Sequence, residues 1–145
     1  MKSEPLVRSA TITDAVPLAR LATALGYPST ADDIEERLLA LRYDEDHAVY
    51  VVVDDEELRG FAHVAVRPTL VSGLSVELLA LVVDERARGR GLGRALLDRV
   101  HAFARERDID DVRVCSNVVR ERAHRFYEAN GYTRAKVQVV LRRTL

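Results

Sequence analysis

The run Arg88-Gly89-Arg90-Gly91-Leu92-Gly93 combines a flexible backbone with positive charge, a composition suited to binding phosphate. It lies between an apolar stretch, Leu78 to Val83, and a segment patterned as a helix, Arg94 to Arg107. A turn of this kind exposes backbone N–H groups at the positive end of a helix dipole, which is equivalent to about half an elementary charge. Glycines also let the main chain approach a ligand closely. The run therefore predicts a phosphate-binding turn.

The spacing of the glycines narrows the kind of phosphate ligand. A dinucleotide-binding turn follows G-x-G-x-x-G, and here the third glycine comes one residue too early. A P-loop requires a lysine and then Ser or Thr after its last glycine, and no such lysine follows Gly93. The pattern that fits is R-x-x-G-x-G, formed by Arg88, Gly91 and Gly93.

The elements around the turn predict a mixed α/β sheet with helices on both faces. Apolar periodicity and turn residues give the order β-α-α-β-β-β-α-β-α-β. The strands are expected at 6–9, 48–53, 58–67, 75–83, 110–115 and 132–141, and the helices at 13–25, 30–41, 94–107 and 120–129. Thr30 with Asp33 predicts a capped start for the second helix, and Gly26 and Gly131 predict stops.

Composition predicts one soluble domain over residues 1–145. Hydrophobic residues make up 48% and charged residues 31%, with a formal net charge of −1. No apolar run approaches the roughly 20 residues of a spanning helix, and the first residues lack a signal-peptide core, so we expect a cytoplasmic protein. The single cysteine, Cys115, excludes an internal disulfide and a cysteine-cluster zinc site, and no metal site is predicted.

A second motif follows the turn after a helix and a strand. It comprises Ser116 to Arg120, Ala123 to Glu128 and Asn130-Gly131-Tyr132. Together with the Arg88 to Gly93 run and the order of elements, it resembles the GCN5-related N-acetyltransferase (GNAT) superfamily over nearly the whole chain. The resemblance implies a GNAT-like, mostly antiparallel sheet in a single domain. It also implies direct transfer of an acetyl group from acetyl-coenzyme A (acetyl-CoA) to a primary amine.

The resemblance also implies how acetyl-CoA is held. Its pyrophosphate would lie on the turn residues Arg88, Gly89, Arg90, Gly91, Leu92, Gly93 and Arg94. Its pantetheine arm would bind the main chain of Leu81, Val82 and Val83 as an added strand would. The N–H of Leu81 or Val82 would face the thioester oxygen, and the sequence does not choose between them. Asn117 is similar to an asparagine that touches the pantetheine, with a loop or capping role as the alternative.

Tyr127 is the candidate general acid. The resemblance places a frequent catalytic tyrosine here, and a phenol of pKa about 10 is protonated at neutral pH and can give its proton to the departing thiolate. Helical spacing with Ala123 and Phe126 also allows Tyr127 to be a core aromatic residue.

The identity of the general base is undecided, with three candidates. Glu77 is expected on the central strand in phase with Leu79, Leu81 and Val83, and so on the face of the acetyl site. Many relatives carry a carboxylate nearer the middle of this strand, where Leu79 and Ala80 stand. His63 on the preceding strand is the second candidate, and a solvent-mediated route without a dedicated base is the third.

The sequence thus predicts an acetyl-CoA-dependent N-acetyltransferase whose amine acceptor is unidentified. A non-catalytic acyl-CoA sensor of the same fold is the alternative. A nucleic-acid-binding domain built on the arginine cluster is disfavoured by the near-neutral net charge. No membrane partner is expected. A homodimer using Lys136 to Leu141 follows from the resemblance alone.

Overall fold

The structure is a computed structural model that describes residues 4–116 and 118–145. It divides into two compact units, Met1–Val114 and Cys115–Leu145. The first unit holds the sheet and most of the helices, and the second holds a single described helix. One domain over the whole chain stays a prediction.

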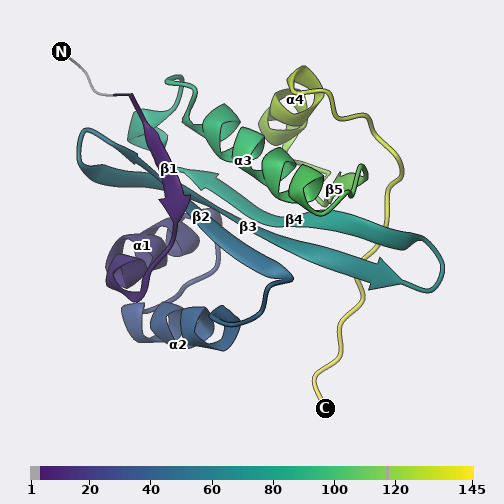
Figure 1. Cartoon of the computed structure of the whole chain (residues 1–145), viewed down its shortest axis with the longest axis horizontal. Coiled ribbons are helices and arrows are strands. Elements are labelled where there is room, and N and C mark those ends of the chain that lie inside the picture. Colours follow the sequence, from purple (N-terminus) through teal and green to yellow (C-terminus); the bar gives the residue numbers. More distant parts are fainter. Residues whose placement is uncertain (1–3, 117) are drawn as a thin grey trace. The chain divides into compact units, whose positions relative to one another are not determined.

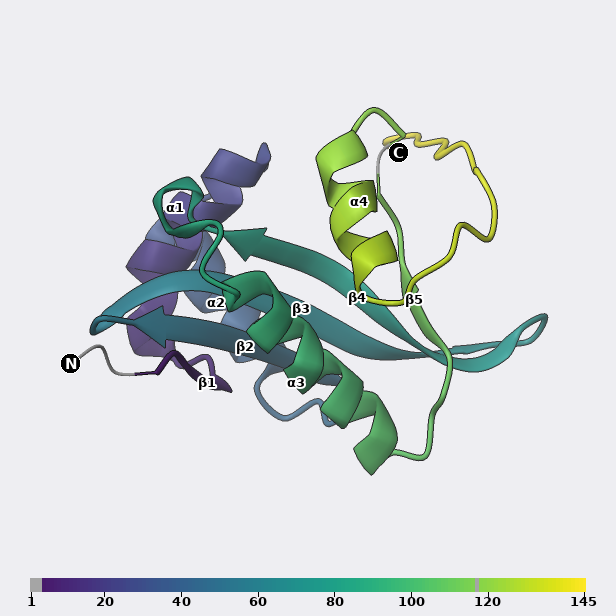
Figure 2. The same cartoon turned by 90° about the horizontal axis from the view of Figure 1, so that it is seen from above.

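The first unit is built on a five-stranded sheet in the order β1-β2-β3-β4-β5 (Figure 1). Neighbouring strands are antiparallel except β4 and β5, which are parallel. The strands are β1 (Leu6–Ser9), β2 (His47–Asp54), β3 (Glu57–Thr69), β4 (Gly73–Val83) and β5 (Val112–Val114). The β3–β4 hairpin extends beyond the neighbouring strands (Figures 1 and 2). The mostly antiparallel sheet is confirmed.

Capping residues set the ends of the helices. The helices of this unit are the short 3-10 turns η1 (Ile12–Asp14) and η2 (Glu85–Ala87), and α1 (Ala15–Leu25), α2 (Ala31–Leu41) and α3 (Leu92–Glu106). Thr30 and Asp33 form the predicted capping box at the start of α2. Gly26 ends α1 with a φ of 106°, a left-handed conformation that favours glycine.

Helices cover both faces of the sheet, as predicted (Figure 1). On one face α1 contributes Leu18 and Leu21 to a cluster with Val51 of β2 and Val82 of β4. On the other face α3 runs across the strands (Figure 2). The α3 residues that are buried there are Leu92, Leu96, Leu97, Val100, Phe103 and Ala104. These residues recur at helical spacing, so α3 turns one apolar stripe towards the sheet.

The second unit contains α4 (Glu121–Ala129), and its last residues form no strand in the part of the chain that the structure describes. The final strand predicted over 132–141 is therefore wrong. Val137, Val139 and Val140 are 75%, 82% and 91% exposed. An apolar alternation makes a strand only where another strand supplies hydrogen-bond partners, and the described residues of this unit contain none.

Among the described residues, none of the helices has both the length and the apolar character needed to cross a membrane.

Candidate active site

The glycine-rich turn joins the end of β4 to the start of α3. Asp84 begins η2, its side chain accepting a hydrogen bond of 3.1 Å from the backbone N–H of Arg86. Gly89 and Gly91 then take φ values of 82° and 76°, which other residues rarely adopt. Gly93 lies inside α3, so the special conformation expected of three glycines occurs at two of them.

The first turn of α3 leaves backbone N–H groups available to a ligand. Gly91 is the N-cap and has no side chain with which to cap the helix. The N–H of Ala95 donates to the carbonyl of Gly91 over 3.0 Å, so those of Leu92, Gly93 and Arg94 precede the helical ladder. A Cβ atom added at Gly89 or Gly91 would meet nothing within 4 Å. This helix end is therefore open and has the geometry that binds anions.

One arginine of the turn is held by the sheet. Arg90 donates to the carboxylate of Asp54 over 3.3 Å, and Asp54, at the end of β2, is only 9% exposed. Arg88 and Arg94 are exposed. Asp54 was not predicted, because the acidic residues from Asp54 to Glu57 have the composition of a solvated turn. A contact across 36 residues leaves no local signal in the sequence.

The second half of β4 has an unpaired edge. β5 pairs with β4 only from Val76 to Leu78, so among the described strands the stretch from Leu79 to Val83 is bonded on its β3 side alone. Just past β4, the N–H of Asp84 donates to the carbonyl of Arg59 in β3 over 2.6 Å. Backbone groups alternate in direction along a strand, so Val82 also faces β3, whereas Leu81 and Val83 face the open edge.

A β-bulge interrupts β4 beside this edge. His63 of β3 pairs with Ala80 and the next residue, Val64, pairs with Leu78, so Leu79 is the extra residue. Directly paired residues share a face of the sheet, which places Glu77 on the face of Ala80 and Val82. The prediction that Glu77 shares a face with Leu81 and Val83 is therefore wrong, because the bulge shifts the alternation by one residue.

Glu77 also has a cationic partner. Its carboxylate accepts from Arg67 of β3 over 3.1 Å, and its side chain is 16% exposed against 43% for Arg67. Glu77 therefore forms an ion pair that links β4 to β3.

Tyr127 lies on α4 in the second unit. Its ring makes edge contacts with Phe126 at a centroid distance of 5.3 Å and with Tyr132 at 5.7 Å. Burial raises the pKa of the Tyr127 phenol above its ordinary value, against a smaller opposing effect of Arg120. The hydroxyl is thus protonated at neutral pH and able to donate. Asn117, the other candidate from this region, lies outside the described residues.

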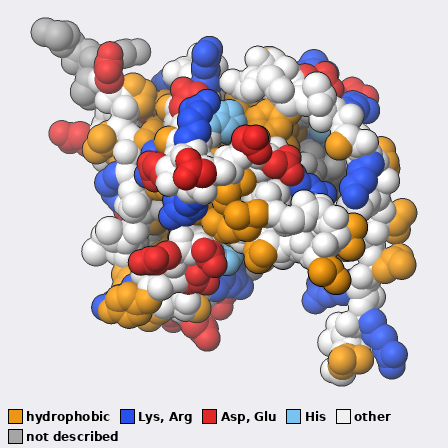
Figure 3. All heavy atoms as spheres, turned by 45° about the vertical axis from the view of Figure 1, so that its right-hand side comes forward, with side chains coloured by type: hydrophobic (Ala, Val, Ile, Leu, Met, Phe, Trp, Pro, Cys, Tyr) orange, Lys and Arg blue, Asp and Glu red, His pale blue; other side chains and the backbone are white. Residues whose placement is uncertain are grey.

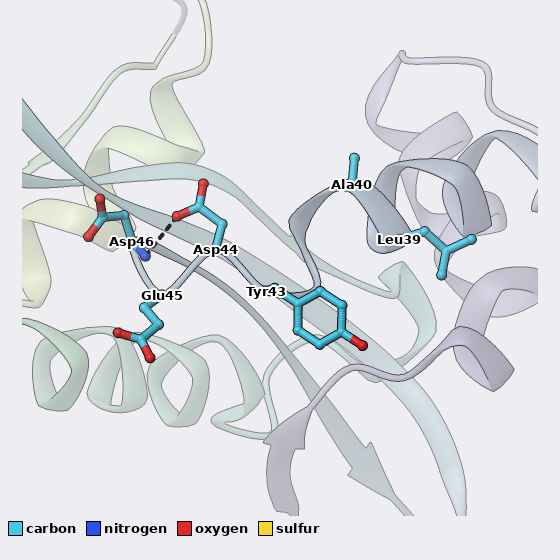
Figure 4. A pocket seen from close by; sticks show the side chains of 6 residues that line it. All are labelled: Leu39, Ala40, Tyr43, Asp44, Glu45 and Asp46. Atoms are coloured by element: carbon cyan, nitrogen blue, oxygen red, sulfur yellow. Dashed lines mark hydrogen bonds between the residues drawn. The ribbon is translucent and has the colours of Figure 1, made fainter.

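An open pocket of about 610 Å³ lies at the end of α2 (Figure 4). It is lined by Leu39, Ala40, Tyr43, Asp44, Glu45 and Asp46. Asp44 accepts a hydrogen bond of 3.0 Å from the backbone N–H of Asp46, and the three carboxylates point in different directions (Figure 4). Such an arrangement gives a negative surface and does not converge on one ion. No cluster of at least three potential metal ligands occurs among the described residues.

Charged side chains of both signs are interspersed over the surface in Figure 3. This distribution agrees with the formal net charge of −1.

Comparison with known proteins identifies the family of this chain. The profile of the "Acetyltransferase (GNAT) family" matches residues 17–132. The chain therefore belongs to the GNAT acetyltransferase family. It is an N-acetyltransferase, as predicted.

Two curated relatives differ in how much of their length the chain spans. The chain is 31% identical over 147 residues to the aminoglycoside N(6')-acetyltransferase type 1 of Stenotrophomonas maltophilia, covering 99% of this chain and 95% of that protein. It is 44% identical over 57 residues to the mycothiol acetyltransferase of Beutenbergia cavernae, covering 39% of this chain and 19% of that protein.

Solved structures share the fold. An aminoglycoside N-acetyltransferase, AAC(6')-Iy, solved in complex with CoA, has a TM-score of 0.87 at 17% identity, covering 99% of this chain and 97% of that one. Glucosamine-6-phosphate N-acetyltransferase from Arabidopsis thaliana has a TM-score of 0.83 at 19% identity, covering 97% and 99%. At these identities the likeness concerns the fold alone.

Proposed function

We propose that this protein transfers an acetyl group directly from acetyl-CoA to a primary amine. The observation that carries the proposal is the continuity of two features within the first unit. The open edge of β4 leads through η2 into the uncapped start of α3, so an extended ligand with amide groups at one end and phosphates at the other finds partners along one path.

The phosphates would bind at the turn. The N–H groups at Gly89, Gly91 and Leu92 through Arg94 supply donors, with Arg88 and Arg94 adding charge from exposed positions. Arg90 has a different role in this proposal: its ion pair with Asp54 holds the turn against the end of β2.

The thioester would lie beside the open edge. Its carbonyl oxygen would accept from the N–H of Leu81, and the pantetheine amides would bond to the backbone of Leu81 and Val83. Val82 contributes packing from the opposite side of the strand, through its side chain in the α1 cluster. This assignment favours Leu81 over Val82 as the oxyanion donor, a choice supported by the direction of the Asp84 hydrogen bond.

Tyr127 would protonate the departing thiolate, as its neutral phenol allows. Asn117 stays a proposed pantetheine contact. Glu77 would act in this proposal through the negative charge of its carboxylate, which forms an ion pair with Arg67. Both units would form one catalytic domain over residues 1–145, supported by a family match that runs across their boundary.

A homodimer in the cytoplasm is the proposed state of the protein. The segment from Lys136 to Leu141 supports the dimer, because its exposed apolar alternation is suited to pairing with a strand of a second copy.

The acceptor would be a cationic amine, and aminoglycosides are the first class to test. Their support is the relative from Stenotrophomonas maltophilia, over 95% of whose length the chain aligns. Asp44, Glu45 and Asp46 give the surface near the α2 end a negative potential that attracts such a molecule.

The test compares acetyl-CoA binding by calorimetry in the native protein, Gly91→Asp and Gly73→Asp. Gly91 and Gly73 have nearly equal φ values, +76° and +75°, and open space at both Cβ positions. Both variants therefore carry the same backbone strain, and only Gly91→Asp places a carboxylate at the turn. We expect Gly91→Asp to lose binding and Gly73→Asp to keep it. Equal binding by both variants would refute the phosphate turn.

Turnover on a panel of amines then separates an enzyme from the sensor alternative. Release of CoA thiol with at least one amine supports the enzyme. Tight acetyl-CoA binding without turnover on any amine supports the sensor.

A further inference from the structure

Two histidines form a hydrogen-bonded pair on the face of the sheet that α1 covers. The Nδ1 atom of His47 in β2 lies 3.0 Å from the Nε2 atom of His63 in β3, and the ring centroids are 5.2 Å apart. One nitrogen of the pair must therefore carry the proton and the other accept it. Neither the turn nor the open edge uses these rings.

The register of the sheet places His63 next to the proposed acetyl site. His63 pairs with Ala80 of β4, the residue between the bulge at Leu79 and the outward-facing backbone of Leu81. His63 and Ala80 therefore share a face. The side chain of Ala80 is a single methyl group, which leaves little bulk between the imidazole and the open edge.

The pair continues towards solvent through an acidic residue. The Nε2 atom of His47 lies 3.9 Å from a carboxylate oxygen of Asp44, and the two side chains are 28% and 48% exposed. The three residues thus run from a partly buried ring to an exposed carboxylate.

His63 is neutral under ordinary conditions. Burial, and then the neighbouring His47, lower the pKa of His63 to about 4. A neutral imidazole carries one N–H and one lone pair, so it can accept a proton on one nitrogen while releasing another from the opposite nitrogen. A group that passes a proton onward does not need to retain it.

The same face carries Arg67 and, in an ion pair with it, Glu77. Glu77 pairs with Ala65, which in turn pairs with His47. An ion pair of 3.1 Å joins its carboxylate to Arg67. The charges of Glu77 and Arg67 offset each other, so the carboxylate of Asp44 is the charge that favours a proton moving along the histidines.

We propose that His63, His47 and Asp44 form a proton-release path for acetyl transfer. The inference rests on the proposed function. The amine nitrogen forms the new C–N bond, and the C–S bond breaks with its electron pair leaving on sulfur. A protonated amine loses two protons in this reaction: one balances the proton that Tyr127 gives to the thiolate, and the other is released.

The path carries the released proton. It enters His63 at Nδ1, the Nε2 proton of His63 moves to Nδ1 of His47, and the Nε2 proton of His47 leaves to Asp44 or water. Exchange with water restores the starting tautomers. In this scheme His63 is the proton acceptor, and His47 and Asp44 are positioning and relay residues.

The test is the pH dependence of kcat for His63→Gln and His47→Gln, with His101→Gln on α3 as the matched histidine control. An acceptor from the amine panel and saturating acetyl-CoA are used, and circular dichroism checks folding. We expect kcat at pH 7 to fall about tenfold to a hundredfold for both path variants, with little change in the KM of acetyl-CoA. The loss should disappear near pH 10, where the amine arrives already neutral.

The results distinguish failure of the proton path from failure of the proposed function. Native-like kcat in His63→Gln, or a loss that is the same at pH 7 and pH 10, overturns the path while leaving the acetyltransferase intact. A native protein that binds acetyl-CoA and acetylates no amine refutes the proposed function itself. If His63→Gln misfolds, His63→Asn is measured instead and judged by the same pH criterion, and imidazole added to His63→Ala should restore part of the activity.

Discussion

Gly60→Ala tests how tightly β3 and β4 are packed beside the open edge. A Cβ atom at Gly60 would lie 2.6 Å from the carbonyl oxygen of Val82, 3.2 Å from Cγ1 of Val52 and 3.3 Å from Cα of Val83. Ordinary contact begins at 3.4 Å, so the methyl group overlaps the carbonyl by about 0.8 Å. Two of the three neighbours are backbone atoms, which cannot rotate away, so the strands themselves must separate.

The expected cost lies near the upper end of the range for overpacked cores, about 3 kcal/mol. For a chain of this length that corresponds to a decrease in Tm of about 10 °C. Because the displaced residues, Val82 and Val83, border the proposed thioester site, acetyl-CoA should also bind more weakly at a temperature where the variant is folded.

Thermal unfolding followed by circular dichroism measures the effect, with Gly73→Ala as the control. Gly73 has open space around its Cβ position and a φ of +75°, so its replacement costs backbone strain alone, about 1 kcal/mol. If Gly60→Ala proves no less stable than Gly73→Ala, the close approach of the two strands is refuted.

Two further predictions concern ionisable groups. Arg8 bonds to Asp14 over 2.8 and 2.9 Å and holds the pKa of that buried carboxyl below its usual value, so its stabilising effect is present above the unfolded pKa of about 3.9 and is lost as the pH falls through the lower folded value. Asp14→Asn should therefore cost about 2 kcal/mol in urea unfolding at pH 7 and less at pH 2, and an equal cost at both would contradict the ion pair. Tyr127→Phe should lower kcat about a hundredfold with the acetyl-CoA Kd unchanged, as measured by steady-state kinetics and calorimetry. Unchanged kcat would remove Tyr127 as the acid.

Local rules predicted most of the fold. The capping box at Thr30 and the stop at Gly26 depend on residues a few positions apart, and both were confirmed. The last strand could not be judged in this way, because an alternating segment such as Val137 to Leu141 needs a partner strand that its own sequence does not specify.

Local sequence patterns also predicted the candidate site only in part. The conformation of the glycine turn was predictable because it depends on one short run of sequence. The phase of Glu77 was not, since a bulge depends on how β3 pairs with β4. The Arg90–Asp54 and His47–His63 contacts join residues that only the folded sheet brings together.

The bulge at Leu79 divides β4 into two parts that differ in how their edges are paired. From Val76 to Leu78 both edges of the strand pair with neighbouring strands, and after Leu78 one edge is open among the described strands. Substitutions before the bulge therefore affect the folding of the sheet. After it, the backbone of Leu81 and Val83 keeps its direction whatever side chains the strand carries, so one strand provides both a fixed framework and room for a different thioester or amine.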